Sequence, residues 1–188
     1  MARAFETTID DADYERIALE DGDRLWELWD GVLVEKPGMS FEHNDAQVEI
    51  VRQFLPQLNR DLFRIRFNSA RVRRSRSHFI PDVLVIPLDP NRVRASSPGP
   101  LETYAEPAAL IVEIWSPSTG RYDINAKLPM YMARGDREIW RIHPYERKLT
   151  AWRRREDDSY AEVVYLGGVV PVESLPGVTI DLDAVFAP

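Results

Sequence analysis

Two acidic side chains interrupt apolar runs of the kind that form buried strands. Asp82 stands within residues 79–86 and Glu113 within residues 110–115. A carboxylate in such a run is costly to bury unless it is paired, hydrogen-bonded or bound to a cation. Pro81 cannot donate to a strand ladder, so we expect Asp82 at the entry of its strand, whereas Glu113 lies near the exit of the other. If the two strands are antiparallel neighbours, the carboxylates converge at one edge of the core.

A converging pair of carboxylates points to chemistry with a hard cation. Mg²⁺ prefers oxygen ligands and keeps several waters. Such an ion polarises a phosphodiester and lowers the pKa of an attacking water. The structural alternative is that Asp82 caps a turn and Glu113 pairs with an arginine, and the motif alone does not decide between the two.

Lys127 is a third candidate, because lysine is rare in this chain. The sequence has three lysines, at positions 36, 127 and 148, against 21 arginines. A compact ammonium group approaches a water or a developing oxyanion as a point charge, which a planar guanidinium does not. The alternative is a solvated helix lysine.

The elements that must position these groups are predicted from periodicity. Asp30-Gly31 joins two alternating runs, residues 24–29 and 32–36, as a β-hairpin. Residues 43–58 form an amphipathic helix, which Pro56 kinks or ends. The apolar positions of this helix recur at helical spacing: Val48, Val51, Leu55 and Leu58.

A strand over residues 63–67 alternates so that its arginines share one face, and residues 71–73 continue the pattern. The Pro- and Ser-rich loop over residues 87–107 contains a short helical turn near residues 101–104. A second helix follows Asp123, and Lys127 lies within or just before its first turn, because Pro129 is tolerated only there.

The remaining elements complete an α/β fold. We expect closing strands over residues 138–143, 148–153 and 161–166, then a loop at 175–177, a short strand and a brief terminal helix. The architecture is α+β-like, with a mixed sheet flanked by helices. A length of 188 residues fits a single domain over residues 1–188.

Composition excludes several classes of protein. The sequence contains no cysteine, so a disulfide framework and a thiolate metal site are excluded. The N-terminus has no apolar signal core, and no stretch approaches the length of a membrane span. We therefore expect a cytoplasmic protein of a bacterium-like host, with no membrane partner.

The net charge of −7 is distributed unevenly. Residues 1–50 hold fourteen acidic and four basic side chains, whereas residues 64–76 hold no Asp or Glu. The latter segment carries an arginine stripe: Arg64, Arg66, Arg71, Arg73, Arg74 and Arg76. Because screening confines fields to roughly 8–10 Å, a basic stripe can bind DNA phosphates on an acidic protein. The alternative is a solvated strand face.

Several short motifs occur together along the chain. They are Asp30-Gly31, His43 at a helix start, Ile80-Pro81-Asp82-Val83, residues 112–119, residues 123–131, Glu138-Ile139-Trp140 and Leu175-Pro176-Gly177. With these motifs in this order, the chain from about residue 11 to residue 186 resembles the Uma-two group of putative restriction endonucleases. That group was formerly a domain of unknown function and lies within the PD-(D/E)XK nuclease superfamily.

The resemblance implies a restriction endonuclease-like core with a Mg²⁺ or Mn²⁺ site at one edge of the sheet. It assigns Asp82, Glu113 and the backbone carbonyl of Ile114 as metal ligands. The superfamily lysine would lie two residues after Glu113, where this chain has Trp115. The Uma-two group is similar in lacking it there, and the role passes to Lys127.

His43 matches a position at which the group commonly has histidine. In the site it would touch the scissile phosphate or orient a metal-bound water, and the alternative is a helix-start residue satisfied by the preceding loop. Glu27 and Glu49 are further acidic candidates. His78 and His143 are expected to be surface or strand-end residues.

The resulting interpretation is a metal-dependent endodeoxyribonuclease that hydrolyses DNA phosphodiester bonds. One alternative is a catalytically inactive DNA-binding or regulatory module of the same fold, which the presence of Asp82, Glu113 and Lys127 disfavours. Another is a metal-dependent phosphoesterase acting on a non-DNA substrate, which the arginine stripe disfavours. A homodimer is expected by analogy, because a double-strand cut requires attack on two strands.

Overall fold

The turn at Asp30-Gly31 forms as its sequence predicts. The computed structural model describes residues 8–88 and 101–187. Asp30 and Gly31 have φ angles of 47° and 82°, the positive values that a tight hairpin turn requires. The predicted hairpin is therefore confirmed, with β1 (Trp26–Trp29) antiparallel to β2 (Val32–Glu35).

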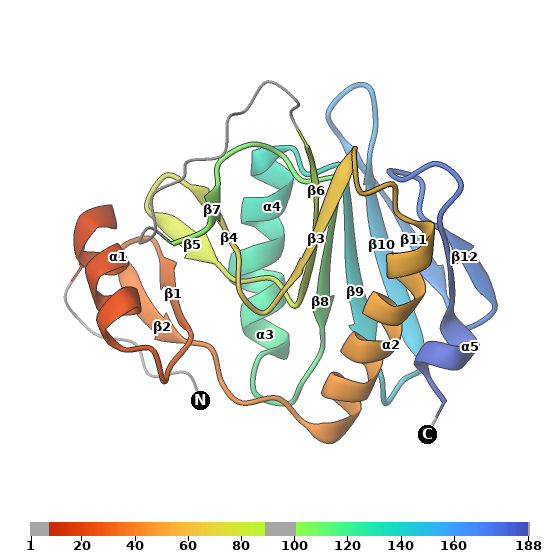
Figure 1. Ribbon diagram of the computed structural model, residues 1–188, viewed down its shortest axis with the longest axis horizontal. Coiled ribbons are helices and arrows are strands. Elements are labelled where there is room, and N and C mark those ends of the chain that lie inside the picture. Colours follow the sequence, from red (N-terminus) through yellow and green to blue (C-terminus); the bar gives the residue numbers. More distant parts are fainter. Residues whose placement is uncertain (1–7, 89–100, 188) are drawn as a thin grey trace.

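The hairpin belongs to a five-stranded sheet in the order β2-β1-β5-β4-β7. Its other strands are β4 (Arg71–Arg74), β5 (Ser77–Phe79) and β7 (Thr103–Tyr104). Helix α1 (Asp11–Glu20) begins at an N-cap, where the Asp10 side chain accepts a hydrogen bond from the Asp13 amide. Tyr14 of this helix is buried together with Trp26 and Leu28. Figure 1 shows α1 and this sheet on one side of the molecule.

The six-stranded sheet carries the two acid-interrupted strands, in the order β11-β10-β9-β8-β6-β3. Its strands are β3 (Phe63–Phe67), β6 (Val83–Pro87), β8 (Leu110–Ile114), β9 (Glu138–His143), β10 (Lys148–Arg154) and β11 (Tyr160–Tyr165). Strands β6 and β8 are antiparallel neighbours, and β8 and β9 are parallel. The arrangement expected for the strands of Asp82 and Glu113 is thus confirmed.

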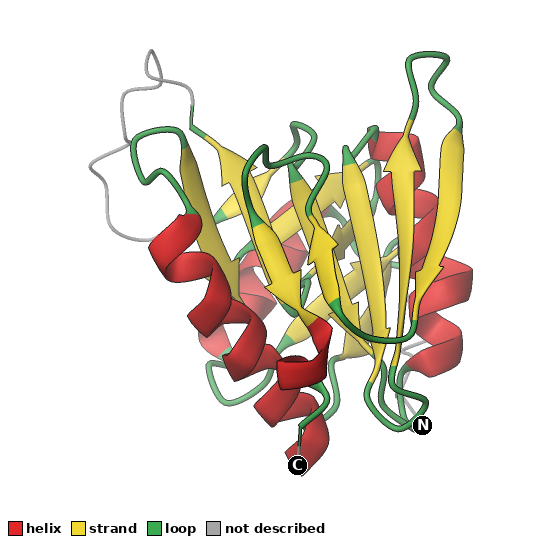
Figure 2. Cartoon of the chain, turned by 90° about the vertical axis from the view of Figure 1, so that its right-hand side faces the viewer, coloured by secondary structure: helices red, strands yellow, loops and turns green. Residues whose placement is uncertain are grey.

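Helices cover both faces of the six-stranded sheet. On one face lie α2 (Phe41–Gln57), α5 (Leu182–Val185) and the small sheet of β12 (Val169–Pro171) and β13 (Thr179–Asp181). On the other lie α3 (Gly120–Tyr122), the π-helix η1 (Asp123–Lys127) and α4 (Leu128–Arg134). Figure 1 places α3 and α4 between the two larger sheets, and Figure 2 shows α2 on the outside of the molecule.

Three expectations of local structure are wrong. The helical turn expected at residues 101–104 is absent there, since Thr103–Tyr104 pairs with β4 as strand β7. Residues 71–73 do not continue the face of residues 63–67, because β3 and β4 belong to different sheets. The buried face of α2 also differs in part from the apolar positions read from the sequence: Val48 and Leu55 are exposed, whereas Leu58 is buried and Val51 packs against the core. It consists of His43, Ala46, Gln47, Ile50 and Phe54.

Three further findings concern the rest of the chain. No described helix is both long and apolar enough to cross a lipid bilayer. The predicted closing strands are confirmed as β9, β10 and β11, as are the short strand β13 and the terminal helix α5. Most of the loop expected over residues 87–107 lies outside the described residues.

Candidate active site

Asp82 stands directly before β6 and is only 1% exposed. Its Oδ1 accepts a hydrogen bond from Nζ of Lys36 at 2.8 Å. Its Oδ2 accepts one from the backbone N–H of Ile114 at 2.7 Å and lies 2.9 Å from Nε2 of His43. Because the Ile114 amide directly follows Glu113 in the chain, Asp82 is tied to the strand end that carries the second carboxylate.

Lys36 is a site residue that the sequence reasoning missed. It follows β2, and its Nζ also donates to the carbonyl of Ile80 at 2.8 Å and to Oδ1 of Asn68 at 2.9 Å. The rarity of lysine could have pointed to it, because Lys36 is one of only three lysines in the chain. The hairpin places this ammonium group beside the six-stranded sheet.

The first two turns of α2 complete the surroundings of Asp82. Ser40 caps the helix by accepting a hydrogen bond from the amide of His43, which fixes where the helix begins. One turn further, Nε2 of Gln47 donates to the backbone carbonyl of Asp82 at 2.6 Å. His43 is buried at 1% exposure and contacts the carboxylate itself. The cap therefore positions a histidine on Asp82.

Lys127 lies among the other carboxylates. Its Nζ is 3.3 Å from both carboxylate oxygens of Glu113 and 3.0 Å from Oε1 of Glu27. The hydroxyl of Tyr131 donates to Oε1 of Glu113 at 2.5 Å. Glu27 also accepts the backbone N–H of Ile80 at 2.8 Å. Glu27 thereby connects Lys127 to the segment that leads into Asp82.

The π-helix η1 sets the direction of Lys127. Its wide turn is closed by the amide of Leu128, which donates to the carbonyl of Asp123 five residues earlier. The carboxylate of Asp123 lies 3.7 Å from Nζ of Lys127. Pro129 follows as the second residue of α4, which continues η1 without a break. Lys127 thus lies just before the first turn of α4, as its sequence predicts.

The buried acid–lysine cluster is defined by Glu27, Asp82, Glu113, Asp123, Lys36 and Lys127. It contains twice as many carboxyl as ammonium groups. Its members come from both large sheets and from η1, so the cluster lies where the two sheets meet. Glu49 is not part of it, because its carboxylate pairs with Arg52 on α2.

The two principal carboxyl groups differ in their pKa shifts. Burial raises the pKa of Asp82, but the Lys36 ammonium and the hydrogen-bonded His43 outweigh it, so the net pKa is below the ordinary value. For Glu113, burial dominates over the attraction of Lys127 and raises the pKa to about 8. Asp82 is therefore the permanent anion of the pair.

Lys127 keeps its proton throughout the neutral range. Burial alone would lower the pKa of its ammonium group, but Glu113, Glu27 and Asp123 together raise that pKa well above the ordinary value. A group with such a pKa acts as a fixed positive charge rather than as an acid or base. In a reaction Lys127 could therefore stabilise negative charge, but it would not donate or accept a proton.

The donor chemistry of the cluster suits a hard divalent cation. Mg²⁺ and Mn²⁺ prefer carboxylate oxygens, and Oε2 of Glu27 is buried with no hydrogen-bond partner among the described residues. Within residues 8–88 and 101–187, however, no three His, Cys, Asp or Glu side chains already stand together as an ion-holding group. Ammonium groups hold Asp82 and Glu113 instead.

Aromatic side chains gather just after the end of β8. Trp115 stacks on His143 with ring centroids 4.1 Å apart, and Tyr145 contacts Trp115 edge to face. A Cβ added at Gly120 would stand 2.1 Å from Nε1 of Trp115, so only glycine allows this close approach. Glu113, near the end of β8, is 5% exposed, and Asp82 and Lys127 are each 1% exposed. The site is closed to a large substrate in this arrangement.

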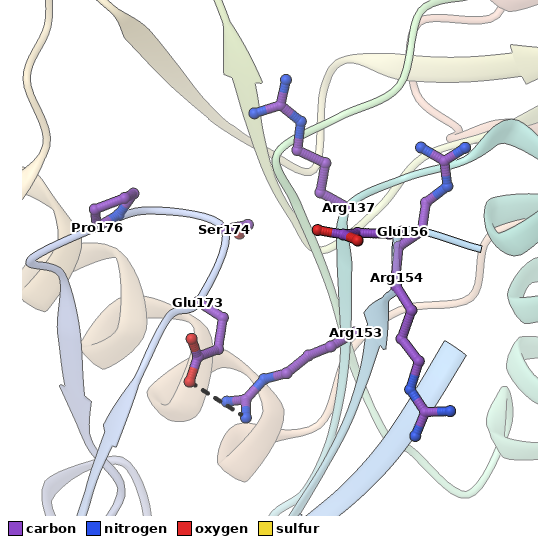
Figure 3. A pocket seen from close by; sticks show the side chains of 8 residues that line it. Arg137, Arg153, Arg154, Glu156, Glu173, Ser174 and Pro176 are labelled. Carbon is purple, nitrogen blue, oxygen red and sulfur yellow. Dashed lines mark ion pairs between the residues drawn. The ribbon is translucent and has the colours of Figure 1, made fainter. Parts of the chain in front are cut away.

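A larger, open cavity lies elsewhere on the described part of the chain. It has a volume of about 460 Å³ and is lined by Arg137, Arg153, Arg154, Arg155, Glu156, Glu173, Ser174 and Pro176 (Figure 3). Arg137 directly precedes Glu138, and Glu138 is the register partner of Leu110, the first residue of β8. Glu113 lies near the other end of β8. Arg153 pairs with Glu138 and Glu173, and Arg154 with Asp158. This cavity is remote from the cluster, and several of its charges are neutralised within the chain.

The arginine stripe does not form one surface. Arg71 is 6% exposed and donates to the hydroxyl of Tyr14. Arg66 pairs with Glu102, and Arg73 with Asp11. The remaining three members lie in different places: Arg64 on β3, Arg74 at the end of β4 beside the Ala133 carbonyl, and Arg76 beside Gly31.

Comparison with known proteins places this chain among nuclease-like sequences and folds. Residues 11–183 match the sequence model of the Uma2 family, described as a putative restriction endonuclease. No curated protein matches the chain. The fold is similar to the crystal structure of a putative nuclease belonging to DUF820 from Anabaena variabilis ATCC 29413, with a TM-score of 0.71 and 18% identity. That match covers 87% of this chain and 90% of the other.

Proposed function

This chain belongs to the Uma2 family of putative restriction endonucleases, and from that premise we propose that it is a metal-dependent endonuclease hydrolysing DNA phosphodiester bonds. The observation that carries the proposal is the convergence of Asp82, Glu113 and Lys127 in one buried cluster. Ion pairs that merely stabilise a fold do not require a surplus of buried carboxyl groups, because each extra one costs desolvation.

In this proposal Asp82, Glu113 and the backbone carbonyl of Ile114 hold Mg²⁺ or Mn²⁺. The ion would supply Lewis-acid stabilisation of the phosphate and a lowered pKa for an attacking water. Lys127, which keeps its proton, stabilises the additional negative charge of the transition state. Lys36 and His43 orient the Asp82 carboxylate through its two oxygens.

In this proposal substrate reaches these groups only after the site opens, because Asp82 and Lys127 are each 1% exposed. Arginines supply the DNA contacts in this proposal, and Arg64, Arg74 and Arg76 are the first candidates. We propose the cytoplasm as the compartment, since the DNA of a bacterium-like host lies there.

One observation favours the inactive DNA-binding module as a second candidate. The ammonium group of Lys36 lies 2.8 Å from Asp82 and already neutralises it. A protein that no longer binds metal would need such a counter-charge, because an unpaired buried carboxylate is strongly destabilising.

Cleavage of supercoiled plasmid by purified protein decides between the two candidates. Activity with Mg²⁺ or Mn²⁺, its loss in EDTA, and its loss in Asp82→Asn and Glu113→Gln would support the nuclease. Glu49→Gln is the matched control, since Glu49 pairs with Arg52 outside the cluster. DNA binding without metal-dependent cleavage, together with no heat of Mg²⁺ or Mn²⁺ binding by calorimetry, would establish the inactive module instead.

A further inference from the structure

Helix α2 carries an apolar stripe on the side that faces away from its own sheet. Phe41, Val48 and Leu55 are 82%, 66% and 44% exposed. They are seven residues apart, which is close to two helical turns, so the three side chains lie along one line. Figure 2 shows this helix at the outside of the molecule.

The stripe is not needed for packing α2 onto the sheet. That contact uses the opposite side of the helix, where Ala46, Ile50 and Phe54 are fully or almost fully buried. Val48 and Leu55 belong to the periodic apolar pattern that predicts burial from the sequence. Several large apolar side chains exposed in one line are characteristic of an interaction surface.

Two charged residues flank the stripe on the same side. Asp45 and Arg52 are also seven residues apart, and both are exposed. On a helix with 100° per residue, each lies between about 40° and 60° from Val48 in the same rotational direction. One flank of the stripe thus carries a negative charge near its start and a positive charge near its end.

The charges on two copies of this helix face match only when the two helices run antiparallel. When two identical helices pair antiparallel around a two-fold axis, residues of the same flank face one another. With the axis at Val48, Phe41 lies opposite Leu55 of the other copy, and Asp45 lies within one residue, about 1.5 Å, of the level of Arg52. A parallel pair would set each flank against the opposite flank and lose the match of charges.

We propose that the α2 stripe binds the same stripe of a second copy of this chain, as an antiparallel helix pair centred on Val48. Arg52 also pairs with Glu49 of its own helix, yet its side chain is 67% exposed. Its guanidinium can therefore bridge both carboxylates. A contact confined to one helix per subunit is below the roughly 1,200 Å² of standard interfaces, so the dimer is weak.

The pair has a consequence for the two acid–lysine clusters. His43, in the first turn of α2, contacts Asp82, so each cluster lies near the N-terminal end of its own helix. In an antiparallel pair these ends point in opposite directions. The dimer therefore does not present both clusters to one stretch of duplex, unlike the dimer expected by analogy with a double-strand cutter.

Sedimentation velocity tests the proposal on the full chain at protein concentrations from about 1 to 200 µM, chosen to span a weak interface. The wild type should move from monomer to dimer over this range. Val48→Glu should remain monomeric, because it places two like charges at the two-fold axis. Val164→Glu is the matched control, since Val164 is 49% exposed on the edge strand β11 and should leave the dimer unchanged.

Charge reversal tests the antiparallel register. Asp45→Arg and Arg52→Asp should each weaken the dimer by about three- to tenfold, as expected for exposed pairs, and the double variant should recover it. Circular dichroism confirms that each variant is folded. A wild type that stays monomeric at the highest concentration, an unaffected Val48→Glu variant, or a double variant weaker than both single ones would overturn the proposal. None of these measurements depends on cleavage, so their outcome neither supports nor contradicts the proposed nuclease function.

Discussion

The ammonium group of Lys36 lies 2.8 Å from Oδ1 of Asp82, although 46 residues separate them in the chain. Both side chains are 2% exposed. The pair joins the end of the N-terminal hairpin to the entry of β6, and so connects the two large sheets at the candidate active site. The pair differs energetically from a surface ion pair, because neither charge would be solvated by water if its partner were removed.

Replacing Lys36 with methionine should cost about 3–5 kcal/mol of unfolding free energy, because it leaves Asp82 buried without its main counter-charge. Urea denaturation monitored by tryptophan fluorescence measures the loss. Lys148→Met is the matched control: Lys148 pairs with the exposed Glu146 on the surface, and its removal should change stability by less than about 0.5 kcal/mol.

Asp82→Ala should also lower stability. Repulsion between carboxylates alone would lead us to expect a higher melting temperature for this variant. In the structure, however, Lys36, His43 and the Ile114 amide all lose their acceptor when the carboxylate is removed. Calorimetry that shows a raised melting temperature for Asp82→Ala would contradict the stabilising role of these contacts.

Lys127→Met should slow cleavage by roughly two to three decades while DNA binding changes little, because the charge acts mainly in the transition state. Single-turnover cleavage and filter binding separate these effects. Because the pKa of Lys127 is raised well above the ordinary value, the wild-type rate should show no loss of a lysine proton up to about pH 10.

Lys127→Arg should rescue the rate poorly, since a fully buried ammonium site has no space for the larger planar group. Near wild-type rates in both variants would assign Lys127 a structural role. A rate that falls with an apparent pKa between about 8 and 10 in the wild type but not in Lys127→Met would contradict the fixed-charge role.

Arginines of the stripe should separate into two groups. Arg64→Ala and Arg76→Ala should each reduce the slope of log affinity against log salt by about 0.9 if the guanidinium contacts a phosphate. Arg71→Ala should instead reduce stability, because Arg71 is buried against Tyr14. Fluorescence anisotropy with labelled duplex DNA measures the slopes, and unchanged slopes in both the Arg64 and the Arg76 variants would exclude these contacts.

The stability of the fold should fall in mild acid through His78. Burial lowers the pKa of His78 below its ordinary value of 6.5, and Asp11 at 3.0 Å offsets only part of the shift. Above pH 6.5 the imidazole is neutral in both states. Below it, the unfolded chain takes up a proton that the folded chain does not, so the free energy of unfolding decreases.

Denaturation at about pH 7.5 and about pH 5.5, on either side of the ordinary histidine value, should therefore show a larger difference for the wild type than for His78→Gln. Asp11→Asn removes the offsetting carboxylate and should enlarge the difference. An NMR titration that places the His78 pKa above 6.5 would reverse the expected sign.

The sequence predicts those parts of the site that depend on local order. Pro81 places Asp82 at a strand entry, Glu113 stands near a strand exit, and Pro129 limits where Lys127 can lie. Each of these placements agrees with the structure. They follow from short-range rules of backbone geometry, which act before tertiary contacts form.

Contacts between distant segments could not be obtained in this way. Lys36 and Asp82 meet only because the first hairpin docks against the second sheet, and no pattern within either segment encodes that docking. For the same reason, residues 63–67 and 71–73 look like one continuous arginine face but belong to different sheets. On α2, the buried histidine and glutamine replace apolar residues because they serve Asp82.

The position of the cluster between two sheets also bears on when the protein becomes competent during synthesis. Glu27 and Lys36 emerge early from the ribosome, whereas Glu113 and Lys127 follow much later, and each early residue pairs with a late one or with Asp82. Contacts of such long sequence separation form late in folding. A nascent or truncated chain that lacks η1 therefore has no Lys127 and only part of its carboxylate set. The hydrolytic activity proposed above can thus begin only after the chain has been synthesised through Lys127.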